Sequence, residues 1–152
     1  MMTTVQYKVG DLFDFCESKG EANAILHVNN DKGGWGSGFV VPLGHHYPGS
    51  ERQYRKWSQS MHDPSYKGPA FRLGNMLPVT CPARDPNASP VVVCNMVAQA
   101  GFGTKRRPRA LRYDALASCL QQVVRMIRKH ANGLSVNIHC PALGAGLAGG
   151  DW

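Results

Sequence analysis

The stretch from His27 to Gly38 constrains the fold and chemistry of this chain more than any other. A short apolar run at residues 24–26 precedes it and favours a β-strand. Three polar side chains come next, and then four glycines in six residues around a tryptophan: Asn29, Asn30, Asp31, Gly33, Gly34, Trp35, Gly36 and Gly38. Glycine lets a backbone approach a ligand closely, and successive exposed N–H groups bind anions. A plain surface turn would not need four glycines, so the pattern predicts a loop that binds hydroxyl and phosphate groups.

Length and composition indicate a single globular domain. The chain has 152 residues, of which 43% are hydrophobic and 18% are charged, a composition that supports one core and argues against disorder. No apolar run approaches the ~20 residues that span a bilayer. Residues 1–5 lack the basic and apolar regions of a signal peptide. The sequence therefore predicts a cytoplasmic protein without membrane contact.

The cysteines are typical of reduced core residues. They are scattered, odd in number and without a Cys-x-x-Cys pair, and most lie in apolar runs: Cys16, Cys81, Cys94, Cys119 and Cys140. We accordingly expect no metal site, and no cofactor.

The net charge of +7 favours polyanionic partners. Much of the excess lies in one segment, with Lys105, Arg106, Arg107 and Arg109. A weak nucleic-acid contact and an ordinary solvated loop explain this segment equally well. No aromatic side chains alternate with the charges, which argues against a platform for stacking single-stranded bases.

Alternating strand and helix patterns predict an α/β fold. We expect strands at residues 5–9, 24–28, 76–81, 91–97 and 134–140, and helices at 13–19, from Ser50 onward, and at 111–130. The helix after Ser50 has capping-box spacing with Gln53, and a core-facing stripe of Tyr54, Trp57 and Met61. The long helix carries a stripe of Leu116, Leu120, Val123, Val124 and Ile127.

Polar or glycine-rich segments follow four predicted strands: Asp11, residues 29–38, residues 99–103 and residues 144–150. Ligands of open α/β sheets bind at the carboxyl ends of strands, so these segments predict one rim and one site. The last segment fits the G-x-G-x-x-G pattern of dinucleotide-binding folds. That pattern belongs to a first strand followed by a helix, whereas here only three residues follow it, so we reject a Rossmann enzyme.

Two such loops, one after Asn-Asn-Asp and one after Pro-x-Leu-Gly-x-Gly-Leu, resemble the macrodomain family, which binds ADP-ribose. The resemblance covers nearly the whole chain. It is closest to the branch that includes terminal ADP-ribose protein glycohydrolase and ADP-ribose-1''-phosphate phosphatase, and to small bacterial single-domain macrodomains. It implies a three-layer α/β/α sandwich with a mixed, mostly parallel central sheet. We expect residues 1–152 to form a single macrodomain that lacks the closing helix or strand with which the family usually ends.

The resemblance also implies a set of ADP-ribose contacts. Asp11 and Leu12 would lie at the adenine end, and Asn29, Asn30 and Asp31 near the distal ribose. The two glycine loops and the segment after the long strand would hold the ribose and diphosphate, through Gly34, Trp35, Gly36, Ser37, Gly38, Phe39, Gln99, Leu143, Gly144, Ala145, Gly146, Leu147 and Ala148.

The implied chemistry leaves three functions open. The glycohydrolase of this branch uses a lysine and an aspartate where this chain has Gln99 and Ala148, and neither of these can form a Schiff base or act as an acid or base. A hydrolase of ADP-ribosyl linkages on acidic side chains or nucleic-acid ends would instead use Asn30, Asp31 and an activated water. Asp31 fits equally well as a loop cap. The alternatives are an ADP-ribose-1''-phosphate phosphatase and a non-catalytic reader of ADP-ribosylated partners.

Overall fold

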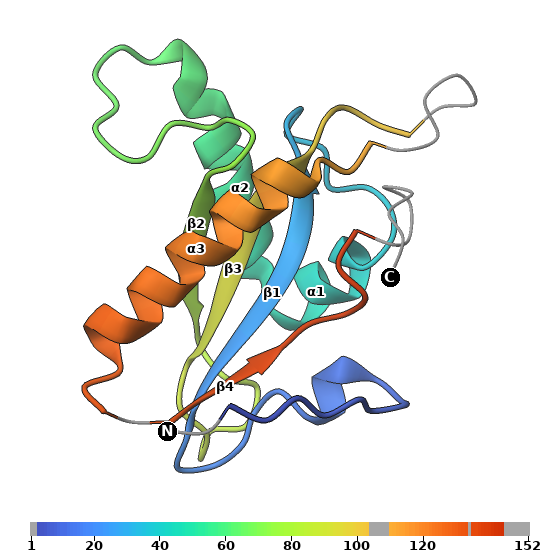
Figure 1. The fold of residues 1–152 in the computed structure, drawn as a ribbon, viewed down its shortest axis with the longest axis vertical. Helices are drawn as coiled ribbons and strands as arrows, with labels where there is room; N and C mark the ends of the chain where they lie inside the picture. The colour runs from blue at the N-terminus through green and yellow to red at the C-terminus, as the bar shows by residue number, and fades with distance from the viewer. Residues whose placement is uncertain (1–2, 104–109, 134, 145–152) are drawn as a thin grey trace.

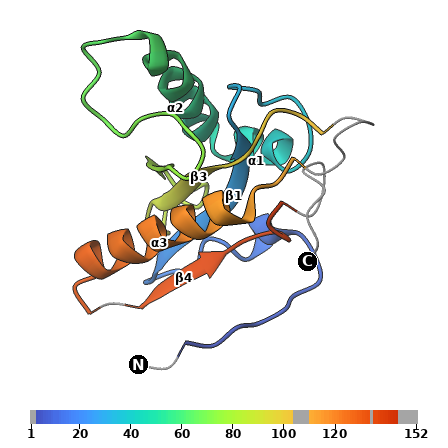
Figure 2. The same cartoon turned by 45° about the horizontal axis from the view of Figure 1, so that its top comes forward.

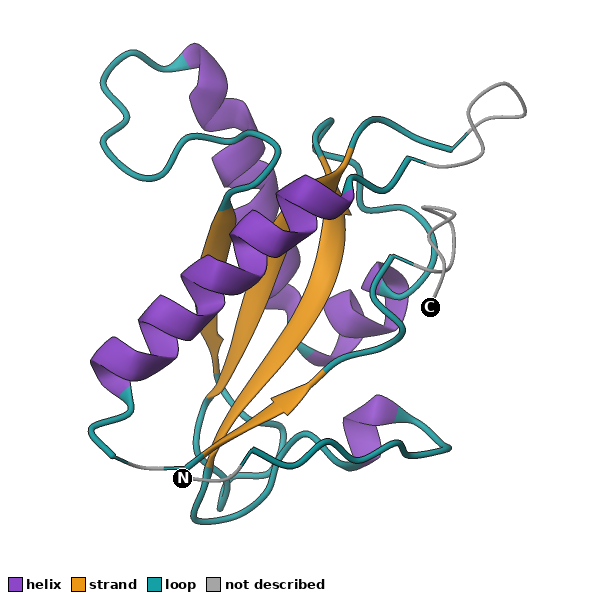
Figure 3. Cartoon of the chain, in the orientation of Figure 1, coloured by secondary structure: helices purple, strands orange, loops and turns teal. Residues whose placement is uncertain are grey.

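A four-stranded mixed sheet forms the centre of the computed structural model, which describes residues 3–103, 110–133 and 135–144. Its strands are β1 (Ala22–Asn30), β2 (Met76–Cys81), β3 (Val91–Gln99) and β4 (Val136–His139), in the order β2-β3-β1-β4. β1 is parallel to both β3 and β4, whereas β2 is antiparallel to β3. Figure 3 shows the sheet between helices on its two faces. The predicted mixed, mostly parallel α/β/α sandwich is confirmed.

Three α-helices cover the sheet. α1 (Val40–His46) and α2 (Pro48–Gln59) lie on one face, and α3 (Tyr113–His130) lies on the other (Figures 1 and 2). Two short 3-10 helices, η1 (Leu12–Asp14) and η2 (Ser60–His62), complete the described elements. No helix in the described part of the chain is long and apolar enough to cross a membrane.

The predicted start of α2 is wrong. The helix begins at Pro48 with Tyr47 as its N-cap, so Ser50 lies inside the first turn, and its hydroxyl donates to the Tyr47 carbonyl oxygen (2.6 Å). Proline at the first helical position needs no hydrogen-bond partner, and this stabilises the earlier start. The helix also ends at Gln59, which leaves Met61 52% exposed outside the predicted stripe.

The predicted strand at residues 5–9 is also wrong. These residues are exposed and belong to no strand, and in Figure 2 the segment runs clear of β4. The alternation of apolar and polar side chains is present, but a strand also needs a neighbour to pair with. The predicted helix at 13–19 is reduced to the single turn of η1.

The core has one apolar layer on each face of the sheet. The α1–α2 layer is built on Ile25, Tyr54 and Trp57, and the α3 layer on Leu26, Cys119 and Val123. β1 contributes to both layers because residues 23–27 are all buried, as its non-alternating sequence predicts. Two predictions are corrected here: Val124 is 43% exposed on α3, and Cys140, unlike the other four cysteines, is exposed.

A polar pair lies inside the α1–α2 layer. His27 is 1% exposed, and its Nε2 donates to Asn95 Oδ1 (2.5 Å), while Asn95 Nδ2 donates to the Ser50 carbonyl oxygen (3.3 Å). Burial disfavours the imidazolium and outweighs the hydrogen bond to Asn95, so the pKa of His27 falls to about 4. The pair ties neighbouring strands to α2, and burial favours the neutral imidazole within it.

We expect acid to destabilise the fold through His27. Between pH 6.5 and 4, His27 is protonated in the unfolded chain but stays neutral in the folded one. The free energy of unfolding therefore falls as pH falls, by about 3 kcal/mol over this window. Denaturant unfolding measured across this range tests the expectation. His27→Gln should flatten the curve, and His62→Gln, which replaces an exposed imidazole, should not. Parallel curves for wild type and His27→Gln would contradict it.

Candidate functional site

The carboxyl ends of β1 and β3 meet at one edge of the sheet because the two strands are parallel. Their register shifts at the end, where Asn29 pairs with Val97 but Asn30 pairs with Gln99. Such an irregularity re-aims side chains. Strict alternation would direct Asn30 toward α3, yet its side chain contacts Tyr54 of α2. The shift therefore turns Asn30 toward the glycine loop that follows it.

The Asn30 carboxamide closes that glycine loop. Its Nδ2 donates to the Gly34 carbonyl oxygen (2.9 Å), and its Oδ1 accepts from the backbone N–H groups of Lys32 (2.9 Å) and Gly34 (3.0 Å). The Tyr54 hydroxyl donates to the Asn30 carbonyl oxygen (2.7 Å) and lies 3.1 Å from Oδ1. Burial raises the pKa of Tyr54, which keeps its hydroxyl a donor. Asn30 thus shapes the loop with every polar atom of its side chain.

Asp31 joins the glycine loop to the segment after β3. Its Oδ1 accepts from the Gly101 N–H (2.8 Å), and its own N–H donates to the Gln99 carbonyl oxygen (3.0 Å). Gln99 Nε2 donates to the Gly101 carbonyl oxygen (2.8 Å). Oδ2 of Asp31 has no hydrogen bond within the described ranges. Oδ1 of Asp31 therefore has a structural role, whereas Oδ2 is available to accept a hydrogen bond or a proton.

The glycine loop presents backbone at the surface. Gly36, Ser37 and Gly38 are exposed, and a Cβ added to Gly36 would meet nothing within 4 Å. Gly33 and Gly38 have φ values of +79° and +82°, which disfavour any residue with a side chain. At Gly34 an added Cβ would lie 2.8 Å from the exposed Phe102 ring, which covers this point of the loop.

The predicted adenine end adjoins the far side of the glycine loop. Asp11 is the N-cap of η1, and its Oδ1 accepts from the Phe13 N–H (3.0 Å). The Phe13 ring stacks on Phe39 at 5.6 Å between centroids, and Leu12 packs on the same core layer. Phe39 is also the residue with which the loop enters α1. This stack brings η1 and the loop together.

Gly144, the described residue of the fourth predicted segment, meets the rim at Leu111. Leu111 forms a β-bridge with Gln99, and a Cβ added to Gly144 would lie 2.6 Å from the Leu111 side chain. Leu143 is 8% exposed and packs in the α3 layer. The described part of the structure thus links the first three predicted segments, and Gly144 of the fourth, through neighbouring contacts.

Besides Leu143, two other predicted ligand residues have buried side chains. Trp35 is 6% exposed, with its ring centroid 5.5 Å from His27 and 5.4 Å from Tyr54. Asn29 is 2% exposed, and within the described ranges neither polar atom of its carboxamide has a hydrogen-bond partner. Neither residue therefore offers its side chain to a ligand at the rim.

Sequence reasoning missed two residues that organise the rim: Tyr54 and Leu111. Tyr54 was assigned only to core packing, a role it also has at 0% exposure. A buried tyrosine usually finds a hydrogen-bond partner for its hydroxyl, so a tyrosine in a core-facing stripe is a weak signal that it also binds a polar group nearby. Nothing in the sequence indicated that Leu111 would contact Gly144.

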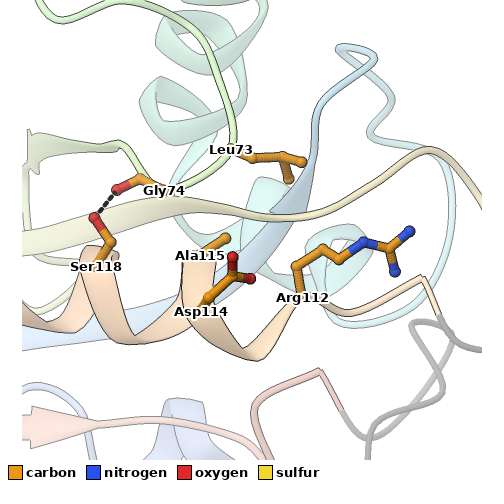
Figure 4. Close-up of a pocket in the computed structure, with 6 residues that line it drawn as sticks. All are labelled: Leu73, Gly74, Arg112, Asp114, Ala115 and Ser118. Carbon is orange, nitrogen blue, oxygen red and sulfur yellow. Dashed lines mark hydrogen bonds between the residues drawn. The ribbon is translucent and has the colours of Figure 1, made fainter.

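A surface pocket of about 380 Å³ lies beside the rim, at the start of α3. Figure 4 shows the six residues that line it: Leu73, Gly74, Arg112, Asp114, Ala115 and Ser118. The Ser118 hydroxyl donates to the Gly74 carbonyl oxygen (2.9 Å), and the Arg112 side chain extends away from that pair. None of these residues belongs to the predicted site.

Some predicted residues lie outside the described residues. They are Ala145, Gly146, Leu147 and Ala148 of the second glycine loop, and Lys105, Arg106, Arg107 and Arg109 of the basic segment.

Similar folds occur among solved structures, although no family model and no curated protein matches the sequence. A macrodomain protein from Streptomyces coelicolor is 32% identical over 93% of this chain and 80% of its own, with a TM-score of 0.67. A protein of unknown function from Bacteroides thetaiotaomicron is 31% identical over 94% and 80%, with a TM-score of 0.72. Thermosipho africanus DarTG, solved in complex with ADP-ribose, shares the fold at 16% identity, over 94% of this chain and 34% of its own, with a TM-score of 0.60.

The fold and rim define a class: an α/β/α domain with glycine-rich backbone at the carboxyl ends of parallel strands. The sequence identity to the Streptomyces macrodomain protein, over most of both chains, decides to which family of that class this chain belongs. The chain belongs to the macrodomain family.

We expect Asn30→Ala to destabilise the fold. The change removes the amide that closes the glycine loop and leaves the Gly34 N–H without its partner. A lost hydrogen-bonded network of this kind lowers the free energy of unfolding by about 2 kcal/mol. Urea unfolding measures the effect, and Asn87→Ala, in an exposed turn, is the matched control. Equal stability of the two variants would show that Asn30 does not hold the loop.

Proposed function

We propose that this chain binds ADP-ribose, free or attached to a macromolecule, along the rim. One observation carries the proposal: two strand-end segments, one rich in exposed glycine backbone, are joined by Asp31 at the carboxyl edge of parallel strands. Exposed N–H groups of such a loop suit a diphosphate. The ADP-ribose complex of the structurally similar Thermosipho DarTG supports the same ligand class.

In this proposal each segment contacts one part of the ligand. Asp11 and Leu12 adjoin the adenine, since η1 is at the far side of the glycine loop. Gly36, Ser37 and Gly38 hold the diphosphate from one side by their N–H groups. Asn30 and Asp31 lie near the distal ribose, where Asn30 acts by shaping the loop.

Hydrolysis of an ADP-ribosyl linkage is the second candidate, and the half-used carboxylate of Asp31 favours it. Oδ1 is occupied by the Gly101 N–H, whereas Oδ2 has no hydrogen bond within the described ranges. A carboxylate so placed can take a proton from water or from a ribose hydroxyl. Gln99 is not a nucleophile of this kind, so a mechanism through a lysine Schiff base is excluded at that position.

Gly36→Ala tests the binding proposal. The added methyl meets no atom within 4 Å, so stability should be unchanged, but the methyl projects where a diphosphate would lie. We expect calorimetric titration to show ADP-ribose binding by wild type, weaker binding of ADP and AMP, and at least tenfold weaker ADP-ribose binding by the variant. No binding of ADP-ribose by wild type would refute the proposed function, and unchanged affinity of Gly36→Ala would refute this placement.

Asp31→Asn and Asp31→Ala together test hydrolysis. Asparagine keeps an oxygen that accepts from the Gly101 N–H but cannot take a proton, whereas alanine removes both properties. If Asp31 is the base, both variants lose release of ADP-ribose from ADP-ribosylated protein or nucleic acid by about 100-fold or more, and only alanine weakens binding. Phosphate release from ADP-ribose-1''-phosphate identifies the phosphatase, and binding without any release identifies the reader.

A further inference from the structure

Glu17, shortly after η1, is the centre of a dense polar cluster. Its carboxylate accepts from the backbone N–H groups of Arg84 and Asp85 (2.9 Å each), from Arg84 Nε (3.2 Å) and from the Tyr47 hydroxyl. Burial alone would raise the pKa of Glu17, but these hydrogen bonds outweigh it and lower the pKa to about 2. The carboxylate is therefore charged at any working pH and 9% exposed.

The Arg84 guanidinium reaches the two neighbouring segments from the same place. Its Nη2 donates to the Phe13 carbonyl oxygen, and its Nη1 lies 3.3 Å from His46 Nδ1. The guanidinium carbon also lies 5.9 Å from the centre of the Phe13 ring and 5.6 Å from that of Tyr47. One side chain thus connects η1, the C-terminal end of α1 and the turn at residues 84–85.

η1 depends on such external support. It is a single 3-10 turn of three residues, and one hydrogen-bonded turn does not repay the entropy of ordering it. Inside the segment, the turn is held by the Asp11 cap on the Phe13 N–H and by two backbone hydrogen bonds, from Asp14 to Asp11 and from Phe15 to Leu12. The Phe13 side chain anchors it against Phe39, and Arg84 holds its backbone from the opposite direction.

We propose that Arg84 is a positioning residue for the ligand site: clamped by Glu17, it holds η1 so that Asp11 and Leu12 form a fixed wall at the adenine end. This inference rests on the proposed function. Arg84 touches no ligand, and its effect is to raise the fraction of molecules in which the wall is in place. Apparent affinity falls in proportion to that fraction, so a wall in place one tenth of the time gives a loss of about tenfold.

Arg84→Ala tests the proposal with two ligands. We expect about tenfold weaker binding of ADP-ribose, and unchanged binding of di(ribos-5-yl) diphosphate, which is ADP-ribose without its adenine. Amide hydrogen exchange at residues 13–17 should also become faster in the free protein. Arg125→Ala removes the same charge from the exposed face of α3 and should change none of these quantities.

The outcomes separate the inference from the function on which it rests. If wild type binds no ADP-ribose, the proposed function fails, while the exchange measurement still reports whether Arg84 holds η1. If wild type binds, equal losses for both ligands, or no loss for ADP-ribose, overturn the inference. Glu17→Gln is the second variant should Arg84→Ala fold poorly, because it weakens the grip on Arg84 while keeping an acceptor oxygen. This variant should also bind ADP-ribose more weakly and di(ribos-5-yl) diphosphate as wild type does, with a smaller loss of ADP-ribose affinity than Arg84→Ala.

Discussion

The parallel pairing of β1 with both of its neighbours is the constraint on which the rest of the structure depends. Because β1, β3 and β4 run in the same direction, the segments that follow them leave the sheet at one edge. The same pairing buries β1 on both faces, so its position is set by two apolar layers at once. A rim supported in this way does not shift relative to the core. The site thus inherits its geometry from the most buried strand of the chain.

The rim is built mainly from polar groups that bind one another. Asn30 closes the glycine loop, Asp31 ties that loop to Gly101, and Asp11 caps η1. These bonds order backbone N–H groups before any ligand arrives, which lowers the entropic cost of binding. Asn30 and Asp31, the two residues predicted from the sequence to be catalytic, thus also hold the rim segments in place by hydrogen bonds. Asp31 combines such a bond with a second carboxylate oxygen that has no hydrogen bond in the described part of the chain.

Local patterns predicted β2, β3 and α3 closely, but they failed at residues 5–9 and at the start of α2. The strand at Met76–Cys81 was predicted with its observed bounds, and the long apolar run at Val91–Gln99 was two residues short. The predicted stripe on α3 failed at Val124 because periodicity gives the direction of a face but not its width. Ser50 failed as a cap because the proline two residues earlier was the better start. These errors share one cause, which is that packing against other elements decided what the local pattern left undetermined.

The sequence by itself determined the fold class and the buried central strand, and it predicted where the segments of the rim fall, because apolar runs, glycines and chain order are local properties. Only the tertiary structure decided what the polar residues of the rim do. Whether Asn30 meets a ligand or Gly34 depends on a register shift against β3, and the placement of Tyr54 depends on how α2 packs. The clamp from Glu17 through Arg84 to η1 spans 67 positions of sequence at its central ion pair, and no local pattern encodes a contact of that range. Contacts between distant segments are set by the packing of the whole core, which is why they emerge only in three dimensions.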